Sequence, residues 1–436
     1  MMMSTDQKKQ FNKLNTYFLV LFFVIVFAVP IYWLTRSKST PEVSVIEART
    51  LAAMPAKSFP NLKTGVELIK QGEFSEGAKI LYGLFTNSSF IQKVENAVSD
   101  QFPLRMPAIA FSKAMDRLII NFAYSFTTDN IIPADVTTNI YYDRKNQQLI
   151  FSPAIFDENK KEQIDLRIKN YQEIIQTYPD ISFYLFYHQT LRYSSHHPLN
   201  DIFENADKGQ ALTYFEESIP AGIAFEKFIL ANYGDYLKYY YRTDHHWNIH
   251  GILRAYDQIY NLISEDYEDI SKKLEYKQIV SFPEIDYLGN NARQTFYPVK
   301  GDLFEVAQFD LPPYKLVEDG NEVDFERTEK YLSGNYSKIQ YTDHYNAYYG
   351  DIPAGLIEYT FENNSERNLL LFGSSYSAPL QPLLASHYKQ TFCVDLRYYT
   401  DFSLSQFMSK FDIDDILIIG DNPVAFQDVE YWFITP

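Results

Sequence analysis

The segment that decides the fold is Asn-Leu-Leu-Leu-Phe-Gly-Ser-Ser-Tyr-Ser, residues 368–377. Its first five residues form an apolar run, which is typical of a strand buried on both faces of a parallel sheet. The residues that follow predict a helix over 379–388, a strand over 391–396, a helix over 404–411 and a strand over 416–419. Strands and helices that alternate over so short a distance predict a parallel, doubly wound α/β sheet.

The preceding part of the chain fits the same class of fold. Residues 139–152 predict a hairpin, because Ile-Tyr-Tyr and Leu-Ile-Phe flank a polar turn. Residues 157–178 carry apolar side chains at helical spacing, and residues 181–187 follow as a buried strand. Between residues 266 and 366, charges and prolines break up short apolar pieces, so we expect an inserted lobe that is irregular or rich in β-structure. The prolines of this region are Pro283, Pro298, Pro312, Pro313 and Pro353.

A candidate nucleophile lies in the turn Gly373-Ser374-Ser375-Tyr376-Ser377. A serine at a tight turn from strand to helix is raised above the sheet edge, where backbone N–H groups at the helix start can stabilise an oxyanion. The same turn also has a purely structural interpretation, because glycine permits tight turns and serine is a favoured N-cap. The turn alone therefore leaves both interpretations open.

A candidate general base lies in the segment from Tyr241 to Gly251, which holds three of the eight histidines. Asp244 comes two residues before His246, and an Asp so placed can orient the imidazole that accepts a proton from a distant serine. His246 and His250 are four residues apart, which is also the spacing of a metal site on a helix. However, the helix is expected to begin near Asn248, and no Glu follows His246, so we expect no bound metal and no cofactor. A similar string, residues 342–345, is predicted to be a loop with local hydrogen bonds.

The N-terminal part contains a membrane-anchor candidate, because residues 14–35 include no charged side chain. A helix of this length crosses a hydrocarbon core roughly 30 Å thick. Lysines precede the run, which favours a cytoplasmic tail over residues 1–13 and an extracytoplasmic body. A cleaved signal peptide is the alternative, but the run is longer than the usual apolar core of a signal and lacks a clear cleavage site. We therefore expect a single-pass protein of the cell membrane, with a linker over residues 36–44 and one domain over 45–436.

The composition excludes several classes of protein. The formal net charge is −17, and no basic patch offsets it, so we expect no nucleic-acid partner. Cys393 is the single cysteine, which excludes an intrachain disulfide, a cysteine-based zinc cluster and an iron–sulfur site within the chain. The chain holds 36 Tyr and 34 Phe, whose rings could stack on sugars, although burial is their usual fate.

The segment Thr243-Asp244-His245-His246-Trp247 resembles the signature of the DHHW proteins of Gram-positive bacteria. These proteins are relatives of the AlgX and AlgJ alginate O-acetylation proteins in the SGNH-hydrolase-like group. The resemblance spans nearly the whole body, and its short motifs occur in order along the chain. The further matching segments are residues 47–55, 100–105, 373–377, 382–388 and 394–399.

The resemblance implies a flavodoxin-like SGNH fold in which the Asp-x-His block precedes the serine. It also implies that Ser375 is the nucleophile, His246 the general base and Asp244 the residue that orients it. The family usually shows Gly-Asp-Ser-Tyr, and Ser374 replaces that Asp here. The implied activity is that of an O-acetyltransferase or acetylesterase on a cell-surface polysaccharide, with an integral-membrane acyl carrier or acyltransferase as partner. The alternative is a non-catalytic glycan-binding or scaffold component of the same machinery.

Overall fold

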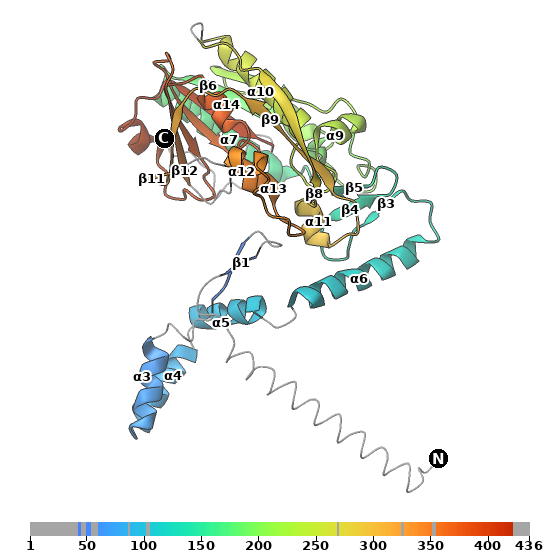
Figure 1. The fold of residues 1–436 in the computed structure, drawn as a ribbon, viewed down its shortest axis with the longest axis vertical. Coiled ribbons are helices and arrows are strands. Elements are labelled where there is room, and N and C mark those ends of the chain that lie inside the picture. Colours follow the sequence, from blue (N-terminus) through green and yellow to red (C-terminus); the bar gives the residue numbers. More distant parts are fainter. Residues whose placement is uncertain are drawn as a thin grey trace. The chain divides into compact units, whose positions relative to one another are not determined.

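The computed structural model describes residues 42–44, 49–53, 60–85, 88–101, 105–267, 270–323, 327–350 and 355–421 (Figure 1). The chain forms two compact units, Met1–Met115 and Asp116–Pro436. The predicted anchor over residues 14–35 lies outside the described residues, as do the predicted tail and most of the linker, so these stay predictions. Of the described helices, none is both long enough and apolar enough to cross a membrane.

The first unit contains a short antiparallel strand pair and a series of helices. The strands are β1 (Glu42–Ser44) and β2 (Arg49–Leu51), and the helices are α3 (Pro60–Lys70), α4 (Phe74–Phe85), α5 (Ser88–Gln101) and the start of α6 (Arg105–Tyr124). The Ala52 N–H donates to Asp100 Oδ2 at 2.9 Å, and Gln101 Nε2 donates to the Ala52 carbonyl at 2.8 Å. Two of the motif segments, residues 47–55 and 100–105, are therefore joined by hydrogen bonds.

The second unit is built around a mixed sheet of eight strands in the order β11-β10-β12-β14-β13-β15-β6-β7. The five strands from β14 to β7 are parallel, whereas β12, β10 and β11 extend the sheet in antiparallel fashion. In chain order, the strands are β6 (Ser182–His188), β7 (Ile223–Phe228), β10 (Tyr314–Glu318), β11 (Asn321–Glu322), β12 (Leu356–Phe361), β13 (Asn368–Gly373), β14 (Gln390–Val394) and β15 (Asp415–Gly420). The predicted parallel core is thus confirmed, and the antiparallel edge was not foreseen.

Both faces of the parallel strands are covered, which explains the continuous apolar run in β13. Leu369 and Leu371 belong to one apolar core, whereas Leu370 and Phe372 belong to another, because successive side chains of a strand point to opposite faces. Helices α10 (Ile249–Ser264) and α14 (Gln381–Ala385) contribute to the first core. Helices α7 (Glu158–Thr177), α8 (Gln210–Glu216) and α15 (Leu404–Met408) contribute to the second. The sheet is therefore doubly wound, as predicted.

Two smaller β-structures flank the sheet. Strands β3 (Ile131–Pro133), β4 (Ile140–Asp143) and β5 (Gln148–Phe151) form an antiparallel sheet, which confirms the predicted hairpin over residues 139–152. Strands β8 (Tyr276–Tyr287) and β9 (Asp302–Phe309) form a long antiparallel ribbon. The remaining helices here are α9 (Tyr233–Tyr239), α11 (Asn290–Thr295), α12 (Arg327–Leu332) and α13 (His344–Tyr349), with the 3₁₀ turn η3 (Leu191–Tyr193).

The region from 266 to 366 is rich in β-structure, one of the two forms that we expected, but part of it belongs to the main sheet. Its strands β10, β11 and β12 pair into the main sheet, and the ribbon packs into the first apolar core through Phe282, Tyr287 and Phe304. Pro283 lies where the register of the ribbon shifts between Phe282 and Asp286. A bulge tolerates proline, which explains why this proline does not interrupt the strand.

Candidate active site

Ser375 lies in the turn after β13, at the carboxyl edge of the parallel strands. Gly373 is required there, because a Cβ at this position would collide with the Ser377 side chain. The Ser377 hydroxyl and N–H both donate to the Ser374 carbonyl, each at 2.8 Å, and close the turn. The N-cap of α14 is Leu380 and makes no side-chain capping bond. The capping interpretation of the Ser374-Ser375 pair is therefore wrong.

The segment that carries Asp244 and His246 connects α9 to α10. The Tyr241 N–H donates to the His246 carbonyl at 3.1 Å, and Tyr240 bridges to Trp247 across the same bend. Asn248 then caps α10 with its side chain, which accepts from the N–H groups of His250 and Gly251. The bend holds His246 just ahead of the helix rather than on it.

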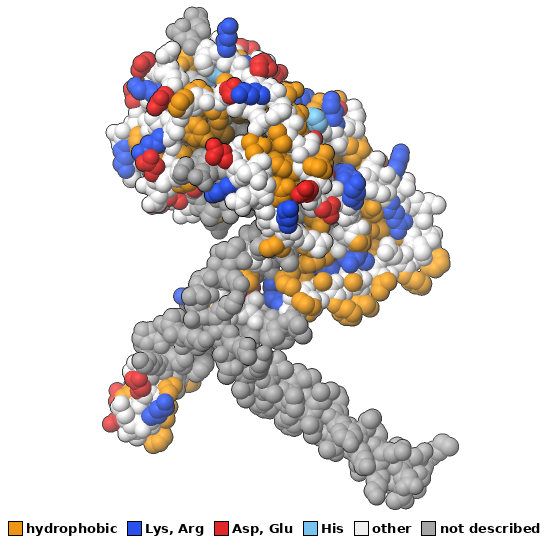
Figure 2. Space-filling model, in the orientation of Figure 1, with side chains coloured by type: hydrophobic (Ala, Val, Ile, Leu, Met, Phe, Trp, Pro, Cys, Tyr) orange, Lys and Arg blue, Asp and Glu red, His pale blue; other side chains and the backbone are white. Residues whose placement is uncertain are grey.

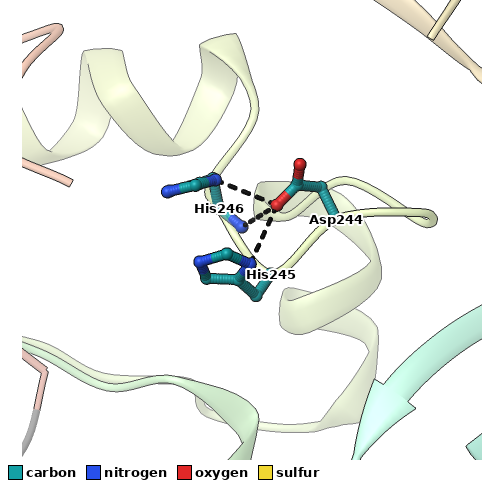
Figure 3. A group of neighbouring side chains, drawn as sticks. All are labelled: Asp244, His245 and His246. Carbon is teal, nitrogen blue, oxygen red and sulfur yellow. Dashed lines mark hydrogen bonds and ion pairs between the residues drawn. The ribbon is translucent and has the colours of Figure 1, made fainter. Parts of the chain in front are cut away.

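The structure brings all three predicted site residues together. His246 Nε2 lies 2.8 Å from Ser375 Oγ, although the two residues are 129 positions apart. His246 Nδ1 lies 2.9 Å from Asp244 Oδ1. Figure 3 shows the imidazole of His246 and the carboxylate of Asp244 side by side in the loop. A serine, an imidazole and a carboxylate in this order form the geometry that activates a serine for nucleophilic attack.

Asp244 is fully buried, and hydrogen bonds hold it as a carboxylate. Its Oδ2 accepts from the Tyr287 hydroxyl at 2.6 Å and from the Asn290 N–H at 2.9 Å. Burial raises the pKa of Asp244, but the imidazoles of His246 and His245 outweigh burial, and the pKa lies well below 3.8. Gly289 lets this segment approach, because a Cβ there would collide with Asp244. Asp244 is therefore ionised and fixes the tautomer of His246 with the proton on Nδ1.

His246 is buried and neutral, as a general base must be before it accepts a proton. Burial lowers its pKa below 6.5, and His245 lowers it further, whereas Asp244 acts in the opposite direction. The ring of Tyr345 stacks on the imidazole, with 4.1 Å between the centroids and 12° between the planes. The Tyr345 hydroxyl also donates to the Ser375 carbonyl at 3.2 Å. Tyr345 thus contacts both residues of the proton-transfer pair and restricts the imidazole to one orientation.

This arrangement predicts how the reaction of Ser375 with an ester substrate depends on pH. We expect kcat/KM to be constant near neutral pH and to fall by about tenfold per pH unit once the pH drops below the pKa of His246. Because that pKa is lowered, the midpoint of the acidic limb lies below 6.5. A pH–rate profile with p-nitrophenyl acetate measures this midpoint, and a midpoint above 6.5 would contradict the neutral state that we assign to His246.

The metal alternative that the sequence left open, with His246 and His250 on one helix face, does not match the geometry. His246 precedes α10 and is buried, whereas His250 lies in its first turn and is exposed. A different group, Asp244, His245 and His246, has its nitrogen and oxygen atoms within 4.8 Å of one another (Figure 3). Asp244 Oδ1 contacts both histidine Nδ1 atoms, at 3.0 and 2.9 Å, and His246 Nε2 contacts Ser375. The contacts of Asp244 with both histidines, and of His246 with Ser375, therefore account for the closeness of these atoms.

Three residues that hold the site together were missed from the sequence. Tyr287 ends β8, Asn290 starts α11 and Tyr345 lies in the first turn of α13, all within the region that we expected to be an irregular or β-rich insertion. The prediction of a loop with local hydrogen bonds over residues 342–345 is confirmed for Thr342 and Asp343 but wrong for the last two residues, because α13 begins at His344 and Asp343 caps it by accepting from the Asn346 N–H. The sequence contained one signal for this helix: Asp is a favoured N-cap, and Asp343 directly precedes the first helical residue.

Taken together, the fold and the site define an α/β protein with a Ser-His-Asp group at the carboxyl edge of its parallel strands. No protein-family model matches the chain, and no curated protein matches its sequence. Among solved structures, the fold is similar to that of PatB1 from Bacillus cereus, with a TM-score of 0.52, 19% identity, and coverage of 66% of this chain and 97% of that one. PatB1 with a sulfonyl adduct aligns similarly, with a TM-score of 0.50, 20% identity, and coverage of 67% and 98%.

A DHHW family protein from Eubacterium siraeum also resembles this chain in structure, with a TM-score of 0.48, 11% identity, and coverage of 69% and 94%. The O-acetyltransferase domain of AlgJ from Pseudomonas putida aligns with a TM-score of 0.35, 10% identity, and coverage of 68% and 93%. Solved structures of a DHHW family protein and of an AlgJ domain are thus among those that this chain resembles, as the motifs predicted. At these identities the similarity concerns the fold alone, and the two alignments to PatB1 carry it.

Proposed function

We propose that this protein is a membrane-anchored, extracytoplasmic O-acetyltransferase or acetylesterase that acts on a cell-surface polysaccharide. Ser375 is the nucleophile, His246 the general base and Asp244 the residue that orients the base. The observation that carries the proposal is the pair of contacts made by His246, at 2.8 Å to Ser375 Oγ and at 2.9 Å to Asp244 Oδ1. The acetyl group and the polysaccharide acceptor come from the resemblance of the motifs to the alginate O-acetylation proteins.

The reaction proceeds in two steps that use the same three residues. First, His246 Nε2 takes the hydroxyl proton of Ser375 while Oγ attacks the acetyl carbonyl carbon, and the proton then passes to the departing oxygen. In the second step, a sugar hydroxyl or water loses its proton to His246 and takes the acetyl group from Oγ, and His246 then returns the proton to Oγ, which restores Ser375. The Asp244 carboxylate stabilises the imidazolium that forms in each step.

The position of the protein follows from residues 14–35, which we propose to be the membrane span that tethers the body outside the cell. The body contains no second apolar run of this length. An integral-membrane acyl carrier is therefore the proposed source of acetyl groups, because a single-span protein cannot move them across a bilayer by itself. A non-catalytic scaffold would not need a buried, neutral histidine within hydrogen-bond distance of a serine, so the site geometry favours the enzyme.

The proposal is tested by covalent labelling of the full chain with phenylmethylsulfonyl fluoride. We expect one sulfonyl group per chain, found on Ser375 by peptide mass mapping, because the reagent reacts with a serine activated by a neighbouring base. Hydrolysis of p-nitrophenyl acetate should disappear in proportion to labelling and should be unaffected by a chelator. Ser374→Ala should label like the parent, whereas Ser375→Ala should not. An unlabelled parent, or a label on another residue, would show that Ser375 is not the activated nucleophile.

A further inference from the structure

An apolar pocket lies beside the Ser-His-Asp group and is formed by five neighbouring segments. Figure 2 shows a hollow with hydrophobic side chains on its walls, at the place where Figure 1 draws α12, α14 and β9. Its walls include Ile249 of α10, Ala307 and Phe309 of β9, Tyr348 of α13, and Ala378 and Leu383 around the start of α14. The cavity measures about 140 Å³. Apolar cavities of about 150 Å³ take up small apolar molecules.

The walls of the pocket continue directly from the residues of the site. Ala378 comes three residues after Ser375, and Ile249 comes three residues after His246. Three residues span at most about 11 Å, so each of these wall positions lies within that distance of its site residue. The third connection is α13, in which Tyr345 stacks on His246 while Tyr348 lines the pocket. The wall of the pocket therefore begins within about 11 Å of the backbone of Ser375.

The chemistry of the walls selects a neutral aliphatic occupant. None of the side chains that line the pocket is charged, although 22% of the chain consists of charged residues. Burial of a charged group without a partner is costly, so a charged ligand is disfavoured there. The net charge of −17 also repels anionic carriers such as phosphorylated thioesters. An uncharged alkyl chain satisfies both conditions.

We propose that this pocket binds the alkyl chain of the acetyl donor, so that the membrane acyl carrier of the proposed function is an acetyl ester of a neutral, lipid-like alcohol. This inference rests on the proposed function. Ser375 Oγ forms a bond to the acetyl carbon, the bond between that carbon and the alkyl oxygen breaks, and His246 returns the proton of Ser375 to that oxygen. The free alcohol leaves from the pocket, and the acetyl group stays on Ser375 for the acceptor.

The proposal is tested with the full chain in lipid nanodiscs and a series of n-alkyl acetates from ethyl to octyl. We expect kcat/KM to rise with chain length by up to about fourfold for each CH₂ that the pocket buries. Ala307→Phe adds a ring to the pocket wall and should abolish most of this rise. Leu303→Phe is the matched control, because Leu303 is an exposed residue of the same strand outside the pocket. An equal rise in both variants, or no rise in the parent, would overturn the proposal.

A separate measurement tests binding to the pocket without any reaction at Ser375. The Ser375→Ala chain in the same nanodiscs is titrated with n-octanol, the alcohol that octyl acetate would release, against empty nanodiscs. We expect saturable binding that Ala307→Phe weakens by about tenfold or more and Leu303→Phe leaves unchanged. If no acetate ester is turned over but octanol binds, the proposed activity fails while the pocket stands. If octanol does not bind above empty nanodiscs, the pocket proposal fails.

Discussion

Ser375→Ala is expected to reduce ester hydrolysis to the uncatalysed background, a loss of at least about 10⁴-fold in kcat. The reason is geometric, because Ser375 Oγ is the oxygen that lies 2.8 Å from His246 Nε2. Removal of the oxygen leaves the base with no proton to accept, so no acyl-enzyme can form. Steady-state hydrolysis of p-nitrophenyl acetate, with a thermal melt of each variant, measures the loss against an intact fold.

Ser374→Ala is the matched control for this substitution. Ser374 is the adjacent serine in the same turn, and its contribution to the turn is its carbonyl, which accepts from Ser377. The substitution keeps that carbonyl, so we expect the rate to stay within about twofold of the parent. The control also tests a difference from the DHHW resemblance, because Ser374 stands where the family usually has Asp. Equal loss in both variants would mean that the turn, rather than the Ser375 hydroxyl, governs the rate.

The parts of the site that the sequence predicted are those with local signals. The strand at residues 368–373 is read from a continuous apolar run, and the serine turn follows from the glycine after it. The Asp-x-His spacing also acts locally, because Asp244 Oδ1 accepts from both the ring and the backbone N–H of His246, two residues away. That the Asp-x-His segment and the serine turn form one site was inferred from the resemblance, because no local sequence pattern connects positions 246 and 375.

The parts that the sequence did not predict depend on contacts between distant segments. Tyr287 bonds to Asp244 across 43 residues, and Tyr345 bonds to the Ser375 carbonyl across 30. Such tyrosines cannot be recognised in a sequence so rich in aromatic residues, because a tyrosine that supports the site has the same local pattern as one that fills a core. The antiparallel edge of the sheet was missed for a related reason. Between β10 and its partner β12 the chain forms β11, α12 and α13, and no periodicity of the sequence connects the two strands.

These unforeseen residues show how the site is held in place. Tyr287 and Asn290 secure the carboxylate, Tyr345 packs on the imidazole, and Tyr376 donates from its hydroxyl to the His245 carbonyl at 2.8 Å. The loop that carries the base is therefore attached both to the serine turn and to the region from 266 to 366. Because that region supplies three of these contacts, it supports the site in addition to extending the sheet.

Asp244→Asn is expected to lower kcat by about 10⁴-fold near neutral pH while the protein stays folded. The carboxylate accepts a hydrogen bond from the Nδ1–H group of His246, which leaves Nε2 without a proton and able to accept the proton of Ser375. An amide that turns its NH₂ group toward Nδ1 favours the opposite tautomer, with the proton on Nε2, and the imidazole then cannot act as a base toward Ser375. The loss should appear in kcat rather than in KM, because the interaction is needed in the transition state.

The matched control is Asp207→Asn, which also removes a fully buried carboxylate. Asp207 accepts from the N–H groups of Gly209 and Ala211, at 2.9 and 3.3 Å, and so stabilises the start of α8. We expect this variant to melt at a lower temperature but to keep its kcat, whereas Asp244→Asn should lose kcat by far more than any change in melting explains. If the two variants lose stability equally and kcat equally, Asp244 acts as a structural residue, and the role that we assign to it in orienting His246 is wrong.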